Sequence, residues 1–307
     1  MARLLSPLRL TGIVTQGFGR GGKELGCPTA NMDQKAVDTA KNLSTVPNVY
    51  HGRKSGVEYT LIEHNPQKRG VVYIPGFTTG QDSDESIILK KYFQNLEDSN
   101  FLCYDPRGMG MSDLKFSDCN FSTWIEDACR MIDMMNEITN TPPLVLSKSL
   151  GGHMATCIAQ RQSCKIHSMV LICPGINYGP VFHEFVKSFI SKKKLRQLEN
   201  GEVITIDLGG HEGWKPFPYS LQLYEDSVAN SIDTSMGPIE GKFPVRVIQG
   251  IDDKTVPFSY SLSLEIDQMY KSDDLQLTYI KNCDHQVIDN KDGFDIIKDT
   301  IETLLES

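Results

Sequence analysis

Short, wholly apolar runs recur along most of the chain and are separated by stretches with helical periodicity. Such runs are typical of strands buried on both faces, the kind that parallel sheets contain. Between them, apolar residues recur at spacings of three and four, as in amphipathic helices. The alternation predicts an α/β fold with a mostly parallel central sheet flanked by helices. The predicted strands span residues 71–74, 101–104, 144–146, 169–173, 245–249 and 275–280.

Three regions add detail to this pattern. Residues 57–62 alternate between apolar and polar, which predicts an antiparallel edge strand. Asp82 and Glu85 predict a capping box at the start of the next helix. Residues 174–240 break the alternation of strand and helix with glycines, prolines, aromatic residues and two short helical patterns. We therefore expect an insertion over 174–240.

Composition and charge narrow the function. The chain has 307 residues and a net charge of −8, which argues against nucleic acid as the main partner. No apolar run approaches the roughly 18 residues of a membrane span. The eight cysteines include no C-x-x-C pair, so the sequence indicates neither a zinc site nor a compact disulfide framework. Cys103 and Cys173 fall within apolar runs and are predicted to be buried thiols. We expect no metal and no other cofactor.

The run 144–155 contains the strongest candidate for chemistry. A buried strand leads into Ser149, which has small residues two positions before and after it, Ser147 and Gly151, and a helix follows. This pattern resembles the nucleophile elbow of α/β-hydrolases, in which a strained turn presents the serine. Ser147 stands where the family usually has glycine. The flanking positions pack so closely there that large side chains would collide.

Other segments support this resemblance in the order in which the family has them. Pro75-Gly76-Phe77 follows a predicted strand, as the oxyanion turn does in the family, and residues 105–112 match its D-x-R-G-x-G-x-S loop. The turn 250–257 resembles G-x-x-D-x-x-V-P, which carries the triad acid, and Asp253 occupies that position. His285 follows the last predicted strand. The resemblance implies the α/β-hydrolase fold with a cap at about 174–240.

The same resemblance implies a mechanism. Ser149 is the expected nucleophile, His285 its base and Asp253 the acid that orients the histidine, and the backbone N–H groups of Phe77 and Leu150 form the oxyanion hole. Asp252 and His153 are expected to play no such part. Residues 57–307 are most similar to the mitochondrial acyl-protein thioesterase branch of the family. The expected activity is cleavage of a carboxylic ester or thioester, in a small acyl ester or an S-acylated protein.

The N-terminal stretch resembles a different family. Residues 12–31 contain a glycine-rich loop, Gly17–Gly22, followed by a G-x-P-T-A-N turn, as at the start of eukaryotic riboflavin kinases. In that family these segments hold ATP and magnesium, a role that would fall here on the loop, Thr29 and Asn31. Residues 48–52 faintly resemble the family's next strand. We expect residues 1–52 to be an incomplete fragment and 57–307 the hydrolase domain; the alternative is riboflavin kinase activity.

The N-terminus also bears on localisation. The first acidic residue is Glu24, and Arg3 and Arg9 lie among leucines. An Arg-bearing, acid-poor start resembles a mitochondrial transit peptide, although Pro7 would interrupt its amphipathic helix. Residues similar to riboflavin kinase account for some of the same charge. The expectation is a mitochondrial protein, with the cytoplasm as the alternative.

Overall fold

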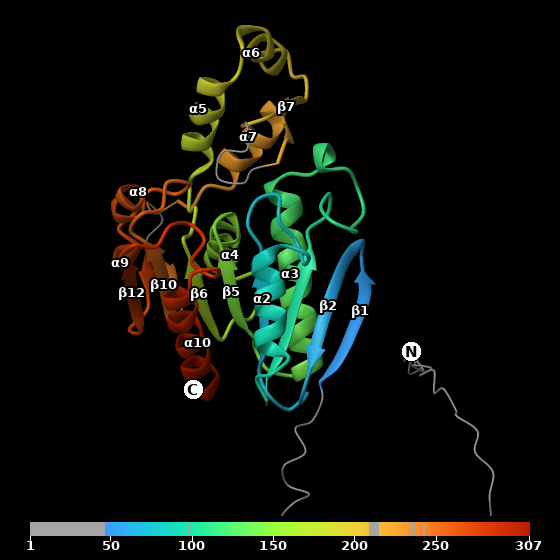
Figure 1. The fold of residues 1–307 in the computed structure, drawn as a ribbon, viewed down its shortest axis with the longest axis vertical. Helices are drawn as coiled ribbons and strands as arrows, with labels where there is room; N and C mark the ends of the chain where they lie inside the picture. Colours follow the sequence, from blue (N-terminus) through green and yellow to red (C-terminus); the bar gives the residue numbers. More distant parts are fainter. Residues whose placement is uncertain (1–46, 98, 209–214, 234, 236–237, 242) are drawn as a thin grey trace, which may run out of the picture. The chain divides into compact units, whose positions relative to one another are not determined.

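A sheet of eight strands runs through the part of the chain that the computed structural model describes, which is residues 47–307 without 98, 209–214, 234, 236–237 and 242 (Figure 1). Its order is β1-β2-β4-β3-β5-β6-β10-β12. Strand β2 is antiparallel to both neighbours, and the remaining pairs are parallel. The strands are β1 (Asn48–Lys54), β2 (Val57–Glu63), β3 (Gly70–Ile74), β4 (Asn100–Asp105), β5 (Leu144–Lys148), β6 (Ser168–Ile172), β10 (Val245–Gly250) and β12 (Leu275–Ile280). The predicted parallel sheet is confirmed.

Helices cover both faces of this sheet, which explains why its strands read as continuous apolar runs. Along β3, Val72 and Ile74 pack into the core that α3 and α4 share, whereas Val71 and Tyr73 pack against α2 and α10. Successive side chains of a strand point to opposite faces, so each strand contributes to two cores. The described helices outside the insertion are α2 (Asp84–Phe93), α3 (Phe121–Thr139), α4 (Leu150–Arg161), α8 (Phe258–Ser263), α9 (Ile266–Met269) and α10 (Lys291–Glu306), and a 3-10 turn, η2, spans Phe116–Asp118.

The expected insertion lies between β6 and β10, at the edge of the sheet where the parallel strands end (Figure 1). Its described residues form three helices, where the sequence indicated two helical patterns. Strands β7 and β8 form an antiparallel pair. Strand β9 pairs with β11 (Tyr270–Lys271), which comes after β10 in the chain. The elements of the insertion are α5 (Gly179–Phe189), α6 (Lys192–Glu199), β7 (Ile204–Ile206), β8 (Phe217–Tyr219), α7 (Leu221–Ala229) and β9 (Ile239–Glu240).

The edge-strand prediction for residues 57–62 needs a correction. Strand β2 is antiparallel, as expected, but it lies between β4 and β1, so β1 is the edge. Residues 48–52, which were expected to belong to the riboflavin-kinase-like fragment, are part of β1. This strand pairs with β2 from Asn48 opposite Glu63 to Lys54 opposite Val57. The pattern missed β1 because its side chains are mostly exposed and carry little apolar signal.

The capping box predicted from Asp82 and Glu85 is also wrong. Helix α2 begins one residue later than that box requires, and Ser83 is its N-cap, accepting a hydrogen bond from the backbone N–H of Ser86. Glu85 is instead buried, with 7% of its surface exposed. Its carboxylate is therefore available to another part of the chain.

The remaining expectations on composition can be compared with the described residues. None of their helices combines the length and apolar character that crossing a membrane requires. Cys103 and Cys173 are buried and unbridged, as their apolar surroundings predicted. The glycine loop at 17–22, Thr29 and Asn31 lie outside the described residues.

Candidate active site

Ser149 occupies a strained turn between β5 and α4. Its backbone angles, φ 54° and ψ −120°, fall where residues other than glycine are rare. A Cβ atom added at Gly151 would collide with the carbonyl oxygens of Ile74 and Pro75. This close approach of helix α4 to β3 accounts for the small residue two positions after the serine. On the other side, Ser147 is fully buried.

Asp253 and His285 meet beyond the ends of two neighbouring strands, β10 and β12. The Nδ1 atom of His285 lies 2.8 Å from Oδ2 of Asp253. The Asp253 carboxylate also accepts hydrogen bonds from Nε2 of Gln249, at 3.0 Å, and from the backbone N–H groups of Thr255 and Val256, at 2.9 and 2.8 Å. Both oxygens are thus held in place, and they fix the orientation of the imidazole.

These contacts keep the Asp253 carboxylate ionised. Its burial opposes the charged form, but the hydrogen bond and charge of His285, the Val256 N–H and the thiol of Cys173 outweigh burial and hold its pKa below the usual value. The pKa of Cys173 is raised well above that of a free thiol, first by burial and then by the charge of Asp253. Cys173 is therefore a neutral donor beside the carboxylate. The sequence indicated a buried thiol here but not this contact.

The acid, the histidine and the thiol form one tight group. The ligand-type atoms of Cys173, Asp253 and His285 all lie within 4.8 Å of one another, and no other group of potential metal ligands is found among the described residues. Because both oxygens of Asp253 already accept hydrogen bonds from N–H groups, a cation would have to displace those donors. The arrangement suits an oriented histidine better than a metal centre.

The two residues assigned no chemistry lie apart from this group. Asp252 is exposed, and its backbone N–H binds the carbonyl of Cys283. His153 is 2% exposed within α4, and burial lowers its pKa to about 4. The Nδ1 atom of His153 accepts a hydrogen bond from the backbone N–H of Asn177, so this ring packs the insertion against the elbow helix.

The turn after β3 lies against the serine. A Cβ atom at Gly76 would be 3.4 Å from Cβ of Ser149, and Phe77 comes next. Leu150 is the first residue of α4, where backbone N–H groups have no carbonyl partner within the helix. Phe77 and Leu150, the two candidate oxyanion residues, both line the same pocket as Ser149.

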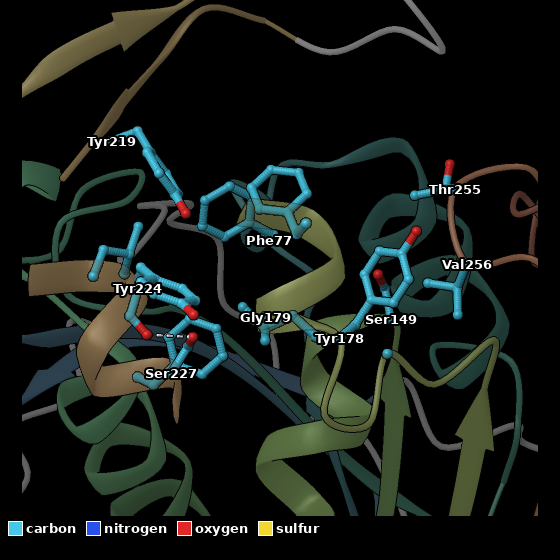
Figure 2. A pocket seen from close by; sticks show the side chains of 14 residues that line it. Phe77, Ser149, Tyr178, Gly179, Tyr219, Tyr224, Ser227, Thr255 and Val256 are labelled. Carbon is cyan, nitrogen blue, oxygen red and sulfur yellow. Dashed lines mark hydrogen bonds between the residues drawn. The ribbon is translucent and has the colours of Figure 1, made fainter. Parts of the chain in front are cut away.

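That pocket, hereafter the apolar pocket, has a volume of about 70 Å³. In Figure 2, Ser149 and Tyr178 lie toward one end of this pocket, Tyr219 and Tyr224 toward the other, and Phe77 between them. Helices α5 and α7 of the insertion supply much of the wall. It is lined by Phe77, Phe121, Ser149, Leu150, Gly175, Tyr178, Gly179, Phe182, Tyr219, Leu223, Tyr224, Ser227, Thr255 and Val256.

Comparisons with known proteins agree with the architecture. Residues 83–207 match a family described as serine aminopeptidase, S33. A putative hydrolase from Agrobacterium vitis has a TM-score of 0.67 at 19% identity, covering 84% of this chain and 98% of that one. Mouse alpha/beta hydrolase domain-containing protein 10 has a TM-score of 0.66 at 20% identity, with the same coverage. The chain has the α/β-hydrolase fold.

A curated relative of this hydrolase extends the likeness to sequence. The mouse protein named palmitoyl-protein thioesterase ABHD10, mitochondrial, is 23% identical over 273 residues, which cover 89% of this chain and 84% of the relative. The two chains are therefore similar over most of their lengths.

The N-terminus matches a second family. Residues 4–90 match riboflavin kinase, and the kinase of Chaetomium globosum is 51% identical over 49 residues. Those residues cover 15% of this chain and only 20% of that kinase. The family match also runs through β1, β2 and β3, which the structure places in the hydrolase sheet. The resemblance to riboflavin kinase is thus confirmed as a short N-terminal likeness.

A second, larger cavity of the hydrolase lies beyond Phe77. This acidic cleft has a volume of about 710 Å³. Its wall comes from the turn 77–80, the start of α2, the loop 105–110, residues 215–218 of the insertion, and the segment after His285. Phe77 lines both cavities and packs edge-on against Phe116, Trp124, Phe182 and Phe217. Phe77 therefore lies at the border of the two cavities, with its ring packed among other aromatic side chains.

The sequence analysis did not predict a buried ion pair that lies next to Ser149. Lys148, which precedes Ser149, is 3% exposed and binds the carboxylate of Glu85. Its Nζ atom also donates to Oε1 of Gln286 at 2.6 Å, next to His285. Burial lowers the pKa of Lys148 to about 8. Lys148 thus connects the turn at Ser149, helix α2 and the segment after His285. Its position within an apolar strand was the sequence signal that could have predicted a buried ion pair.

Proposed function

We propose that the chain is a serine hydrolase that cleaves carboxylic ester or thioester bonds through Ser149, His285 and Asp253. The contact that carries this proposal is the 2.8 Å hydrogen bond between Nδ1 of His285 and Oδ2 of Asp253. With Nδ1 protonated and bound to the acid, Nε2 is the basic nitrogen that can take a proton from a serine. The strained turn at Ser149 and the apolar pocket beside it support the same role.

The proposed reaction has two steps, acylation of Ser149 and then hydrolysis of the acyl-enzyme. His285 removes the Ser149 proton as Oγ attacks the acyl carbon, and the N–H groups of Phe77 and Leu150 stabilise the resulting oxyanion. The intermediate collapses, the bond to the leaving oxygen or sulfur breaks, and His285 gives its proton to the leaving group. Water, deprotonated by His285, next attacks the acyl-enzyme; the bond between the acyl carbon and Oγ then breaks, and His285 returns the proton to Oγ, which releases the acid and restores Ser149.

The substrate is proposed to be a small acyl ester or an S-acylated protein. The aromatic and aliphatic wall of the apolar pocket suits an acyl chain, because burying such a chain removes apolar surface from water. The similar mouse protein is named a palmitoyl-protein thioesterase, which supports a thioester as one substrate class. An ester and a thioester of the same acid would form the same acyl-enzyme on Ser149.

A fluorophosphonate probe tests the proposal directly, since it phosphonylates activated serines. The folded wild-type chain should be labelled, and Ser149→Ala should not. Absence of labelling in folded protein, or labelling that survives in Ser149→Ala, would refute Ser149 as the nucleophile. Hydrolysis of p-nitrophenyl butyrate, followed in both proteins, provides the catalytic readout.

Riboflavin kinase is the second candidate function, favoured by the 51% identity over 49 residues. We propose that this chain lacks that activity, because the likeness covers only 20% of the kinase. We also propose that the hydrolase domain begins with β1, at Asn48, rather than at Val57. Incubation of the full chain with riboflavin and Mg·ATP should yield no FMN; FMN formation would overturn the first statement.

A mitochondrial location is proposed, with the cytoplasm as the alternative. The similar mouse, rat and bovine proteins are named mitochondrial, and the acid-poor start of the chain agrees with import. Sequencing the mature N-terminus from fractionated cells decides between the two. An intact Met1 or Ala2 in the cytosolic fraction would contradict import.

A further inference from the structure

The acidic cleft lies on the histidine side of the site. Gln286 and Asp289, which follow His285, line the cleft, whereas no residue after Val256 lines the apolar pocket. The turn that contains Phe77 borders both cavities. A substrate whose acyl carbon is at Ser149 can therefore place its two halves on opposite sides of Phe77.

The proton transfer to the leaving group indicates which cavity holds which half of the substrate. His285 must hand a proton to the leaving group, so that group has to lie on the side of the histidine segment. The acidic cleft, at about 710 Å³, is larger than the apolar pocket, at about 70 Å³, and can hold the bulkier and more polar half. The leaving group therefore belongs in the cleft and the acyl group in the pocket.

The charge of the cleft is strongly unbalanced. Its described wall includes one basic residue, Lys215, and five carboxylates: Asp82, Asp84, Glu85, Asp105 and Asp289. Three of the five already have partners within the protein. Glu85 binds Lys148, Asp105 accepts hydrogen bonds from Gln81 and the Met111 N–H, and Asp82 lies 3.7 Å from Lys90.

Asp84 and Asp289 remain available to a ligand. Asp84 and Asp289 are both exposed, and neither forms an ion pair with any residue that the structure describes. Burial raises the pKa of Asp289, Lys148 lowers it, and the charge of Asp84 raises it, which places the two carboxylates within electrostatic reach of each other. Two neighbouring unpaired carboxylates in a cleft favour a positively charged guest.

We propose that the acidic cleft is the leaving-group site and that Asp84 and Asp289 select acylated peptides with lysine or arginine beside the acylated residue. The inference rests on the serine-hydrolase function proposed above and names the substrate half that function leaves open. Anionic leaving groups, such as phosphate-bearing thiols, are disfavoured because their charge meets carboxylates of the same sign. A neutral leaving group should give a kcat/KM between those of the cationic and the anionic leaving groups.

Three S-butyryl cysteine peptides of equal length test the proposal, with lysine, glutamine or glutamate on both sides of the cysteine. The wild-type kcat/KM should fall in that order, by about tenfold from the cationic to the anionic peptide at low salt. In Asp84→Asn/Asp289→Asn the three values should agree within about twofold. Titration with a fluorophosphonate gives the concentration of active enzyme in each preparation.

A matched control removes the same number of charges elsewhere. Glu97→Gln/Asp273→Asn changes two exposed acids that precede β4 and β12, at the end of the sheet opposite the site, and should keep the wild-type order. Equal rates for the three wild-type peptides, or an order that survives in Asp84→Asn/Asp289→Asn, would overturn the inference. In both cases Ser149-dependent cleavage of p-nitrophenyl butyrate would leave the proposed function intact, whereas cleavage that persists in Ser149→Ala would refute that function itself.

Discussion

Phe77 separates two cavities with opposite chemistry. The apolar pocket is small and is built largely from α5, β8 and α7 of the insertion. The acidic cleft is large and is built mostly from loops at the ends of β3 and β4, the start of α2 and the histidine segment. The proposed binding of the two halves of a substrate would thus involve largely different residues, although Phe77 lines both cavities and residues 215–218 of the insertion also line the cleft.

The largest expected effect does not depend on either cavity, because the proposed triad would act on every substrate. Ser149→Ala and His285→Ala should each lower kcat by about 10⁴ or more, and the double variant should lose little beyond that. Asp253→Asn should cost about 10⁴ because the histidine would take the wrong tautomer. Turnover of a short-chain thioester provides the measurement.

Asp252 supplies the matched control for the acid. It is adjacent to Asp253 and chemically identical, but it is exposed and makes no contact with His285 that resembles the 2.8 Å bond of Asp253. Asp252→Asn should therefore retain most activity. If Asp252→Asn were the inactive variant and Asp253→Asn the active one, the acid assignment would be wrong.

The next largest effect distinguishes two neighbouring carboxylates of the cleft. Glu85 is paired with buried Lys148, whereas Asp84 faces solvent. Lys148→Met or Glu85→Gln leaves one member of a buried pair without its partner and should lower the free energy of unfolding by about 3 kcal/mol. Asp84→Asn should change it little. Urea denaturation monitored by circular dichroism measures all three.

A double variant checks the cause of that loss. Lys148→Met/Glu85→Leu replaces the ion pair by apolar contacts and should recover most of the stability. Its kcat should nevertheless be lower than that of the wild type, because Gln286 would lose the 2.6 Å hydrogen bond from Lys148 that anchors the histidine segment. Recovery of full activity along with stability would show that the lysine does not position His285.

A smaller effect should be confined to the apolar pocket. Leu223 lines the pocket and is 6% exposed, so Leu223→Phe should fill part of it. The kcat/KM for a p-nitrophenyl octanoate should fall by about tenfold relative to the acetate. Gln222→Phe, at the exposed neighbouring position, is the control. Equal losses on both esters would place the acyl chain elsewhere.

The smallest effect concerns salt. Raising the ionic strength from about 0.02 M to about 0.5 M shortens the screening length to a few ångströms, so the preference of the cleft for cationic peptides should fall several-fold. The preference of the pocket for octanoate over acetate should not fall, since it depends on apolar burial. A charge preference insensitive to salt would contradict an electrostatic origin.

Much of the architecture was predictable because burial on both faces leaves a strong apolar signal. The runs around residues 71–74, 101–104 and 144–146 are central strands for that reason. The apolar pattern did not indicate strand β1, because an exposed edge needs few apolar side chains, and its hydrogen bonds to β2 are made by backbone that any sequence possesses. The cap of α2 was misassigned because Ser83 and Asp82 are both good N-caps, and only the observed backbone distinguishes them.

The sequence by itself determined the order of strands and helices and the local turns around Ser149, Asp253 and His285, because apolar periodicity, glycine positions and motif spacing are local properties. Only the tertiary structure decided which distant groups meet. Lys148 reaches Glu85 and Gln286, and Cys173 reaches Asp253, because parallel strands bring their carboxyl ends to one edge of the sheet. The two cavities on either side of Phe77 arise in the same way, from side chains far apart in the sequence that converge where those strands end.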